Sequence, residues 1–152
     1  MNSLAMQNKV FRDIRSCCQH ILQSYDKMNS SFLSAEKRKN FSQKVDLEIQ
    51  ELLIEKLSQS YKGHKFVAEE PSEKASQTMI DDRDVWVIDP IDGSHNFAHH
   101  IPIFAISICY FFEGEPQVAW VYDPINDELF SAIAGYGATL NQRRIRVSSN
   151  SD

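Results

Sequence analysis

The chain has 152 residues, enough for one domain with a hydrophobic core, and 42% of them are hydrophobic. That proportion is ordinary for a globular protein and argues against disorder throughout the chain. The formal net charge of −5 argues against direct binding to nucleic acid or to an anionic membrane. With no apolar stretch long enough to span a bilayer and no signal-peptide core, the sequence predicts a cytoplasmic protein.

The first third of the chain predicts two helices joined by a loop. Residues 4–25 carry apolar side chains at helical spacing, which is typical of an amphipathic helix. The polar stretch 30–40 shows no periodicity and predicts a loop. A second helix follows, with an apolar face made of Val45, Ile49, Leu52, Leu53 and Leu57. It is expected to end before Gly63, which suits a C-terminal cap.

The three cysteines do not form a recognisable metal or disulfide pattern. Cys17 and Cys18 are adjacent in the first helix, Cys109 lies far along the chain, and no CxxC spacing occurs. We therefore expect buried or half-buried free thiols rather than a zinc site or a disulfide framework.

The rest of the chain predicts strands. A short strand at 65–68 leads into Glu69-Glu70-Pro71, and the polar segment 72–84, with its aspartates, predicts a solvated loop. Apolar or β-branched runs predict further strands at 85–88, 104–112, 117–122 and 128–132. Arginines alternate with apolar residues at 143–147, which is typical of an edge strand. No repeat or linker interrupts this single unit.

The segment Asp89-Pro90-Ile91-Asp92 predicts a metal site. It follows a buried strand, at the strand end where α/β sheets tend to bind ligands. Pro90 stiffens the turn, so that Asp89 and Asp92 can point into one pocket while Ile91 turns its side chain away and offers its carbonyl. Such an oxygen-rich cage suits Mg²⁺.

The next two residues suit a phosphate group. Gly93 lets a ligand approach the backbone closely, and Ser94 can begin a short helix whose free N–H groups favour an anion. The plainer alternative is an ordinary turn, because Asp-Pro and Asp-Gly are common turn dipeptides and serine is a common helix cap.

Two more carboxylates can join this site. If the strand at Lys65 pairs with the strand at Val85, Glu69 arrives beside Asp89, and such close carboxylates repel unless a cation lies among them. Asp46, near the predicted start of the second helix, is a possible further member. The alternative interpretation is that Asp46 is an acid in the first helical turn, where the helix dipole favours a negative charge.

Several ordered motifs together resemble one family. They are Glu69-Glu70, WVIDPIDGSHNF (Trp86 to Phe97), PIFAISI (Pro102 to Ile108), VYDPINDELF (Val121 to Phe130) and GYGATLN (Gly135 to Asn141). In order and spacing they resemble the inositol monophosphatases, a branch of the Mg²⁺-dependent, lithium-sensitive phosphatases. The resemblance implies an α+β fold in which two long helices pack on a mostly antiparallel sheet.

The resemblance also implies a role for each matched residue. Glu69, Asp89 and the Ile91 carbonyl would hold one Mg²⁺, and Asp89 and Asp92 would share a second. The backbone of Gly93 and Ser94, with Asp92, would hold the substrate phosphate. The Ser94 hydroxyl and Asp46 would form the catalytic dyad that activates the attacking water. The implied reaction is two-metal hydrolysis of inositol 1-phosphate or a similar sugar phosphate.

The chain departs from the family pattern in three ways. Ser94 replaces the usual threonine, and Asn40-Phe41-Ser42-Gln43 replaces the family's Asp-x-Val-Thr flap segment. The family continues into a second half with a Trp-Asp motif that supplies another metal ligand, whereas this sequence reaches Asp152 near the start of that half. We expect a single domain over residues 1–152, without the C-terminal half of the family fold.

These departures leave three functions open. The first is a phosphatase domain; the second is a non-catalytic remnant, or a chain that needs a separate C-terminal partner. The third is a regulatory module that binds proteins, since the net charge argues against direct nucleic-acid binding. A homodimer is also possible, because the missing half would expose a sheet edge or a helix face.

Overall fold

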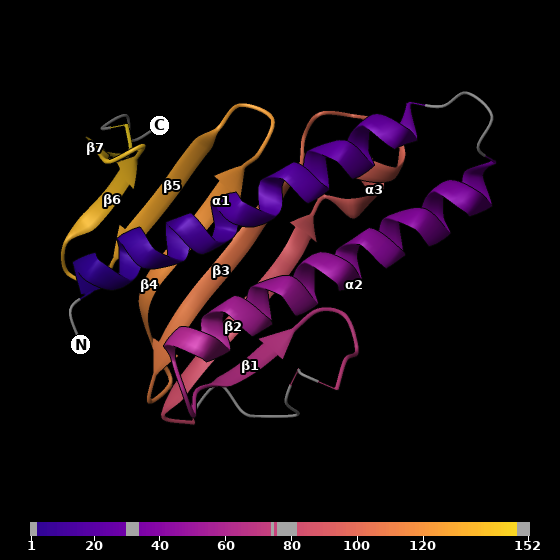
Figure 1. The fold of residues 1–152 in the computed structure, drawn as a ribbon. Helices are drawn as coiled ribbons and strands as arrows, with labels where there is room; N and C mark the ends of the chain where they lie inside the picture. Colours follow the sequence, from indigo (N-terminus) through magenta and orange to yellow (C-terminus); the bar gives the residue numbers. More distant parts are fainter. Residues whose placement is uncertain (1–2, 30–33, 74, 76–81, 149–152) are drawn as a thin grey trace.

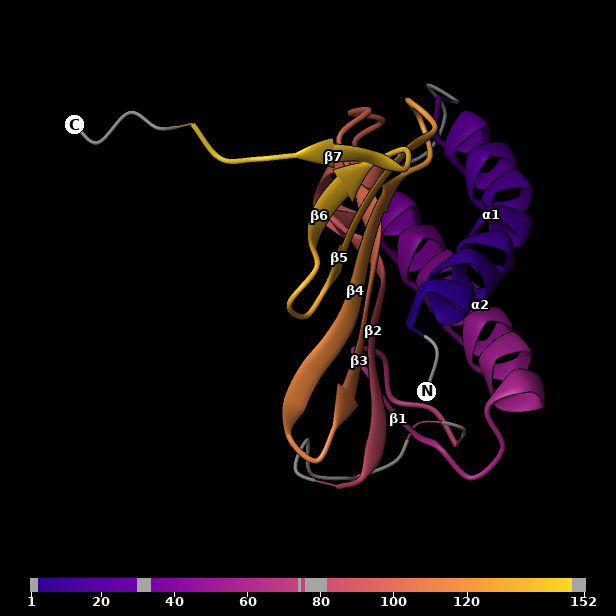
Figure 2. The ribbon, with the colours of Figure 1, turned by 90° about the vertical axis from the view of Figure 1, so that its left-hand side faces the viewer.

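The chain folds into a layer of helices on one face of a single sheet (Figures 1 and 2). The structure, a computed structural model, describes residues 3–29, 34–73, 75 and 82–148. Two long helices, α1 (Ser3–Met28) and α2 (Ala35–Ser60), cover the same face of the sheet. No helix in these residues is long and apolar enough to cross a membrane.

The sheet has seven strands that lie in chain order. They are β1 (Lys65–Ala68), β2 (Asp84–Asp92), β3 (Ala105–Phe112), β4 (Glu115–Asp123), β5 (Glu128–Ile133), β6 (Gly137–Leu140) and β7 (Arg143–Ile145). Strands β1 and β2 are parallel, and every other neighbouring pair is antiparallel. A one-turn helix, α3 (Ser94–Ala98), connects β2 to β3. The α+β prediction, with two long helices on a mostly antiparallel sheet, is confirmed.

Aromatic side chains fill the space between the helices and the sheet. Trp86 on β2 and Trp120 on β4 are fully buried, with ring centroids 6.0 Å apart. Phe97 on α3 is also fully buried and packs edge-on against Phe104, at 5.1 Å. These aromatic residues therefore form part of the core, where each large ring removes apolar area from water.

Several boundaries differ from the sequence prediction. Strand β2 continues to Asp92 instead of ending at Ile88, so Pro90 lies within the strand and not in a turn. The stretch 30–40 is not all loop, because α2 begins at Ala35, with the Ser34 hydroxyl accepting a hydrogen bond from the Lys37 backbone N–H at 3.3 Å. The first turns of α2 consist of good helix formers without an apolar face, so periodicity alone does not reveal them. Asp84 belongs to β2 rather than to the loop before it, and β6 was not predicted. The predicted loop residues 76–81 lie outside the described part.

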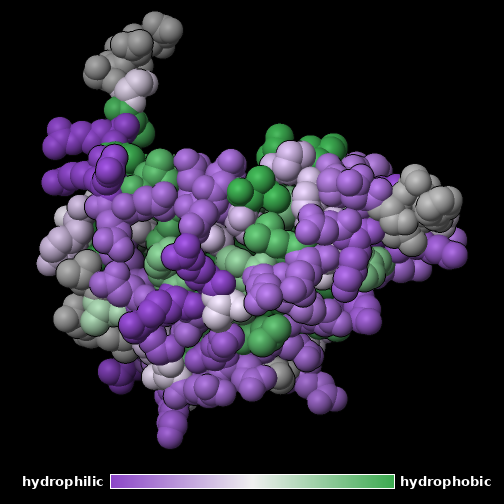
Figure 3. Space-filling view, turned by 45° about the horizontal axis from the view of Figure 1, so that its top comes forward, coloured by the Kyte–Doolittle hydropathy of each residue, from purple (hydrophilic) through white to green (hydrophobic). Residues whose placement is uncertain are grey.

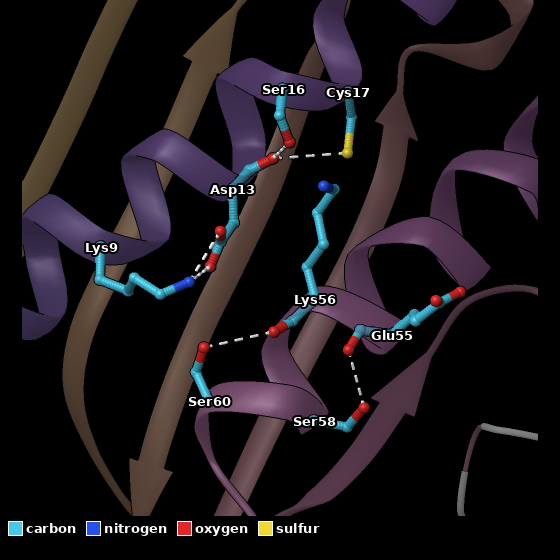
Figure 4. Close-up of polar contacts among 8 residues, drawn as sticks. All are labelled: Lys9, Asp13, Ser16, Cys17, Glu55, Lys56, Ser58 and Ser60. Atoms are coloured by element: carbon cyan, nitrogen blue, oxygen red, sulfur yellow. Dashed lines mark hydrogen bonds and ion pairs between the residues drawn. The ribbon is translucent and has the colours of Figure 1, made fainter.

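The Cys17 thiol of α1 lies at the contact between the two long helices (Figure 4). Cys17 and Cys18 are buried and free, as predicted, and the Cys17 Sγ donates to the Asp13 carbonyl at 3.4 Å. Lys56 of α2 extends toward this turn of α1 in the same view. Burial raises the pKa of the Cys18 thiol from 9.0 to about 11. The fold therefore stabilises the neutral thiol over the thiolate.

This preference predicts a loss of stability at alkaline pH. Between pH 9 and 11 the unfolded chain releases the Cys18 proton while the folded chain retains it, so the free energy of unfolding falls as the pH rises. The slope from this group is at most about 1.4 kcal/mol per pH unit. Urea denaturation at pH 8 to 11 should show a shallower decline for Cys18→Ala than for the unaltered chain. Equal slopes would contradict the assignment.

Candidate functional site

The parallel pairing of β1 and β2 brings two carboxylates to one end of the sheet. Ala68 lies opposite Ile88 in the register, so Glu69 and Asp89, the residues that follow them, meet at the same end. Burial and then the charge of Glu69 raise the pKa of Asp89 to about 7. Burial and the neighbouring Glu69 charge therefore disfavour the charged form of Asp89.

Asp46 adds a third carboxylate from the helix layer. It lies in the middle of α2 and is only 3% exposed, which makes the first-turn, helix-dipole interpretation wrong. Its pKa is raised to about 8, chiefly by burial and then by the charges of Glu70, Glu69 and Asp89, while the Ile91 backbone amide lowers it. An acid buried among other acids needs a specific reason to be there.

Two carboxylate oxygens of this group are buried without a partner. Asp46 Oδ1 and Asp89 Oδ1 accept no hydrogen bond within the part of the chain that the structure describes. Buried polar atoms normally have a partner, and a bound cation can serve as one. The donors are all oxygens, which fits Mg²⁺. Within residues 3–29, 34–73, 75 and 82–148, however, no three His, Cys, Asp or Glu side chains are grouped closely enough to hold an ion.

The end of β2 carries the other predicted residues. The register shifts between Asp89 and Asp92, and the Ile91 side chain is buried in the core, so it points away from the acids. Gly93 caps α3 with a left-handed φ of 94°. A Cβ at Gly93 would lie 3.0 Å from the Ile103 carbonyl oxygen, so the loop before β3 packs directly on this backbone. Glycine is therefore needed here for packing as well as for its torsion angle.

A cavity of about 650 Å³ connects these elements. It lies between α2, the end of β1 and α3. Its lining includes Lys39, Asp46, Glu69, Ser94, His95 and His99. The two members of the expected dyad, Asp46 and Ser94, thus face one cavity with Glu69. Asp89 and Asp92 are not among its lining residues.

One positioning residue was missed by the sequence reasoning. Gln50 is fully buried on α2, and its side chain donates to the Glu70 carbonyl at 2.7 Å and accepts from the Glu70 N–H at 2.9 Å. This pair of bonds fixes the turn that carries Glu69. The available signal was its spacing, since Gln50 lies four residues after Asp46 and so on the same helix face.

A model of the inositol monophosphatase family matches residues 5–152. The chain is 36% identical over 150 residues to the Nus factor SuhB of Vibrio cholerae, covering 97% of this chain and 54% of the relative. It is 46% identical over 101 residues to inositol monophosphatase 2 of Solanum lycopersicum, covering 66% of this chain and 38% of the relative. The chain thus spans about half the length of its curated full-length relatives.

Solved structures agree with the fold. The chain superposes on inositol monophosphatase II from Staphylococcus aureus with a TM-score of 0.82 at 26% identity, covering 98% of this chain and 54% of that one. The extragenic suppressor protein suhB from Bartonella henselae gives a TM-score of 0.79 at 29% identity, covering 96% and 55%.

The packing around Gly93 predicts an unequal pair of glycine substitutions. Gly93→Ala should destabilise the chain by more than Gly63→Ala, although both positions have a positive φ. Each alanine costs about 1–2 kcal/mol for the left-handed torsion. Only the Cβ at residue 93 also meets backbone, whereas nothing lies within 4 Å of a Cβ at residue 63. Equal losses in urea denaturation would show that the close packing is unimportant.

The Gln50 contact predicts a second loss. Gln50→Leu keeps the side-chain size but leaves the Glu70 N–H and carbonyl without their partner, which should cost about 2–4 kcal/mol. Amide hydrogen exchange at Glu70 should accelerate as well. Gln43→Leu, at an exposed position of the same helix, is the control and should change neither measurement. Unchanged exchange at Glu70 in the Gln50 variant would refute the positioning role.

Proposed function

Because the chain belongs to the inositol monophosphatase family, we propose that it is a phosphomonoesterase that depends on Mg²⁺. The proposed substrates are inositol 1-phosphate and similar sugar phosphates. The observation that carries this proposal is the pair of buried, unpartnered oxygens on Asp46 and Asp89, beside Glu69 at one sheet end. A structural core gains nothing from such a group, whereas a cation site requires it.

The proposed metal-binding residues are the carboxylates at the end of the sheet. Glu69, Asp89 and the Ile91 carbonyl would hold one Mg²⁺, and Asp89 with Asp92 would hold the second. When bound, Mg²⁺ neutralises the charge of the phosphate and polarises its oxygens. Pro90 within β2 and the two hydrogen bonds of Gln50 keep these acids in place, because both restrict the backbone that carries them.

The catalytic and substrate-binding residues come from α2 and the start of α3. The Gly93 and Ser94 backbone, with Asp92, would hold the phosphate. The Ser94 hydroxyl would orient the attacking water. It would accept a proton from that water and donate its own proton to Asp46. Ser42 supports Ser94, since its hydroxyl donates to the Ser94 carbonyl at 3.3 Å. His95 and His99 at the cavity would face the rest of the substrate.

A second candidate function is a regulatory module that binds another protein. It is favoured by the 36% identity, over 97% of this chain, to relatives that carry the name Nus factor SuhB. The net charge of −5 favours a protein partner over nucleic acid in that case.

Calorimetric titration with Mg²⁺ tests the first proposal. The unaltered chain should bind Mg²⁺, and Asp89→Asn should weaken binding by more than about ten-fold, because a charged ligand is lost. Asp26→Asn makes the same charge change at an exposed site on α1 and should have no effect.

Phosphate release from inositol 1-phosphate separates the two functions. Release that needs Mg²⁺ and fails in Asp89→Asn is the expected result. Binding of Mg²⁺ without any release would overturn the phosphatase proposal and favour the binding module. A chain that binds no Mg²⁺ would overturn the metal proposal itself.

A further inference from the structure

Two exposed histidines stand side by side at α3. His95 lies in the first turn of this helix, and His99 caps its C-terminus four residues later. The His99 backbone N–H donates to the His95 carbonyl at 3.1 Å, so the helical turn includes both residues. Residues four apart share one helix face. The two imidazole rings accordingly lie with their centroids 4.3 Å apart and their planes at 38°.

The His99 ring is held in one tautomer. Its Nδ1 lies 2.8 Å from the His95 carbonyl oxygen. A carbonyl oxygen only accepts, so Nδ1 carries the proton, and the neutral ring has its lone pair on Nε2. A histidine that binds a metal commonly donates its other N–H to a carbonyl or a carboxylate in this way. The contact therefore leaves a nitrogen donor on a ring whose orientation is already fixed.

Two imidazoles this close suit a transition-metal ion. Imidazole nitrogen is a good ligand for Zn²⁺, Ni²⁺ and Cu²⁺, whereas Mg²⁺ takes oxygen ligands. Zn–N bonds of about 2.0–2.1 Å in a tetrahedral ion place two bound nitrogens roughly 3.3 Å apart. Rings whose centroids are 4.3 Å apart can reach that spacing.

The histidine pair lies at the wall of the cavity that contains the candidate catalytic residues. His95 and His99 line it from α3, while Asp46 and Glu69 line it from α2 and the end of β1. The cavity therefore presents oxygen donors and nitrogen donors, which select different ions. The helix side of the molecule is largely hydrophilic in Figure 3, so water can complete the coordination of an ion there.

We propose that His95 and His99 together bind one Zn²⁺ or a similar transition-metal ion, separately from the Mg²⁺ proposed for the carboxylates. Nε2 of His99 and a ring nitrogen of His95 supply two ligands. Within the described residues no third His, Cys, Asp or Glu is grouped closely enough with them, so water supplies the others. Such a site is open and exchangeable, unlike a structural zinc site with four protein ligands. The binding does not depend on phosphatase activity.

Calorimetric titration with Zn²⁺ tests the proposal. Excess Mg²⁺ is present throughout, because it competes with Zn²⁺ for the carboxylates. The unaltered chain should bind Zn²⁺ at one site. His95→Ala and His99→Ala should each weaken this binding by more than about ten-fold, because a single imidazole cannot chelate the ion.

Two further variants serve as controls. His20→Ala removes an imidazole of α1 that lies 2.9 Å from Glu48, and it should leave Zn²⁺ binding unchanged. Asp89→Asn, which should weaken Mg²⁺ binding, should also leave Zn²⁺ binding unchanged. The histidine site and the carboxylate site can therefore fail independently of each other.

Chemical modification of the histidines gives a readout that needs no substitution. Diethyl pyrocarbonate acylates a free imidazole nitrogen, and mass spectrometry assigns the modified residue. Zn²⁺ should slow the modification of His95 and His99 by more than about ten-fold, because both rings then share one ion, and should not affect His20. This result would locate the ion even if a histidine variant fails to fold.

Several results would overturn the proposal. Zn²⁺ that does not bind in the presence of Mg²⁺ is one, and binding that survives the loss of either imidazole is another. Equal protection of His20 would show that zinc binds surface histidines adventitiously. Zinc held elsewhere, for instance by the Cys109 thiol, would leave both α3 rings reactive.

Discussion

The parallel pairing of β1 with β2 is the constraint on which the site depends. It is the one parallel pair in the described sheet, and its register places Glu69 directly beside Asp89. An antiparallel pairing of the same strands would send the two carboxylates to opposite ends. Burial first, and then the charge of Glu69, raises the pKa of Asp89, so the stability of the surrounding layers has to maintain this arrangement. The buried Trp86, on the same strand, is part of the core that does so.

The helix layer serves both as cover for the core and as part of the site. The face of α2 that buries Ile49 and Leu53 also presents Asp46 and Gln50. Asp46 is a candidate catalytic carboxylate, and Gln50 supports the Glu70 backbone. The core packing of α2 therefore also holds Asp46 and Gln50 in place. A shift of α2 would move Asp46 and, through Gln50, the turn that carries Glu69. The distance between the two carboxylates would therefore change less than the position of either one.

Much of this could be predicted from the sequence, and the exceptions have physical reasons. The segment 85–94 carries strong local signals, namely a β-branched run, a proline and a glycine. The structure has the strand and Gly93 at the start of α3 there, but the strand continues through the predicted turn to Asp92. The start of α2 was mispredicted because residues 35–40 are polar or small and so leave no periodic apolar pattern. That error also produced the wrong helix-dipole interpretation of Asp46. The role of Gln50 depends on a backbone partner twenty residues away, which no local pattern encodes. The metal-binding and catalytic roles of the site residues stay predictions from motif resemblance.

The two faces of strand β2 serve different parts of the structure. Trp86 and Ile88 point into the helix-covered core, so by alternation Val87 and Asp89 face the other way. Val87 pairs with Val67 and Cys109 on the face of the sheet that α1 and α2 do not cover, and Asp89 follows it on the same side. A layer that covers Val87 would therefore also shield one side of the Asp89 carboxylate from water. Exclusion of water strengthens the attraction between carboxylates and a cation, so a layer over Val87 would also affect the proposed metal site.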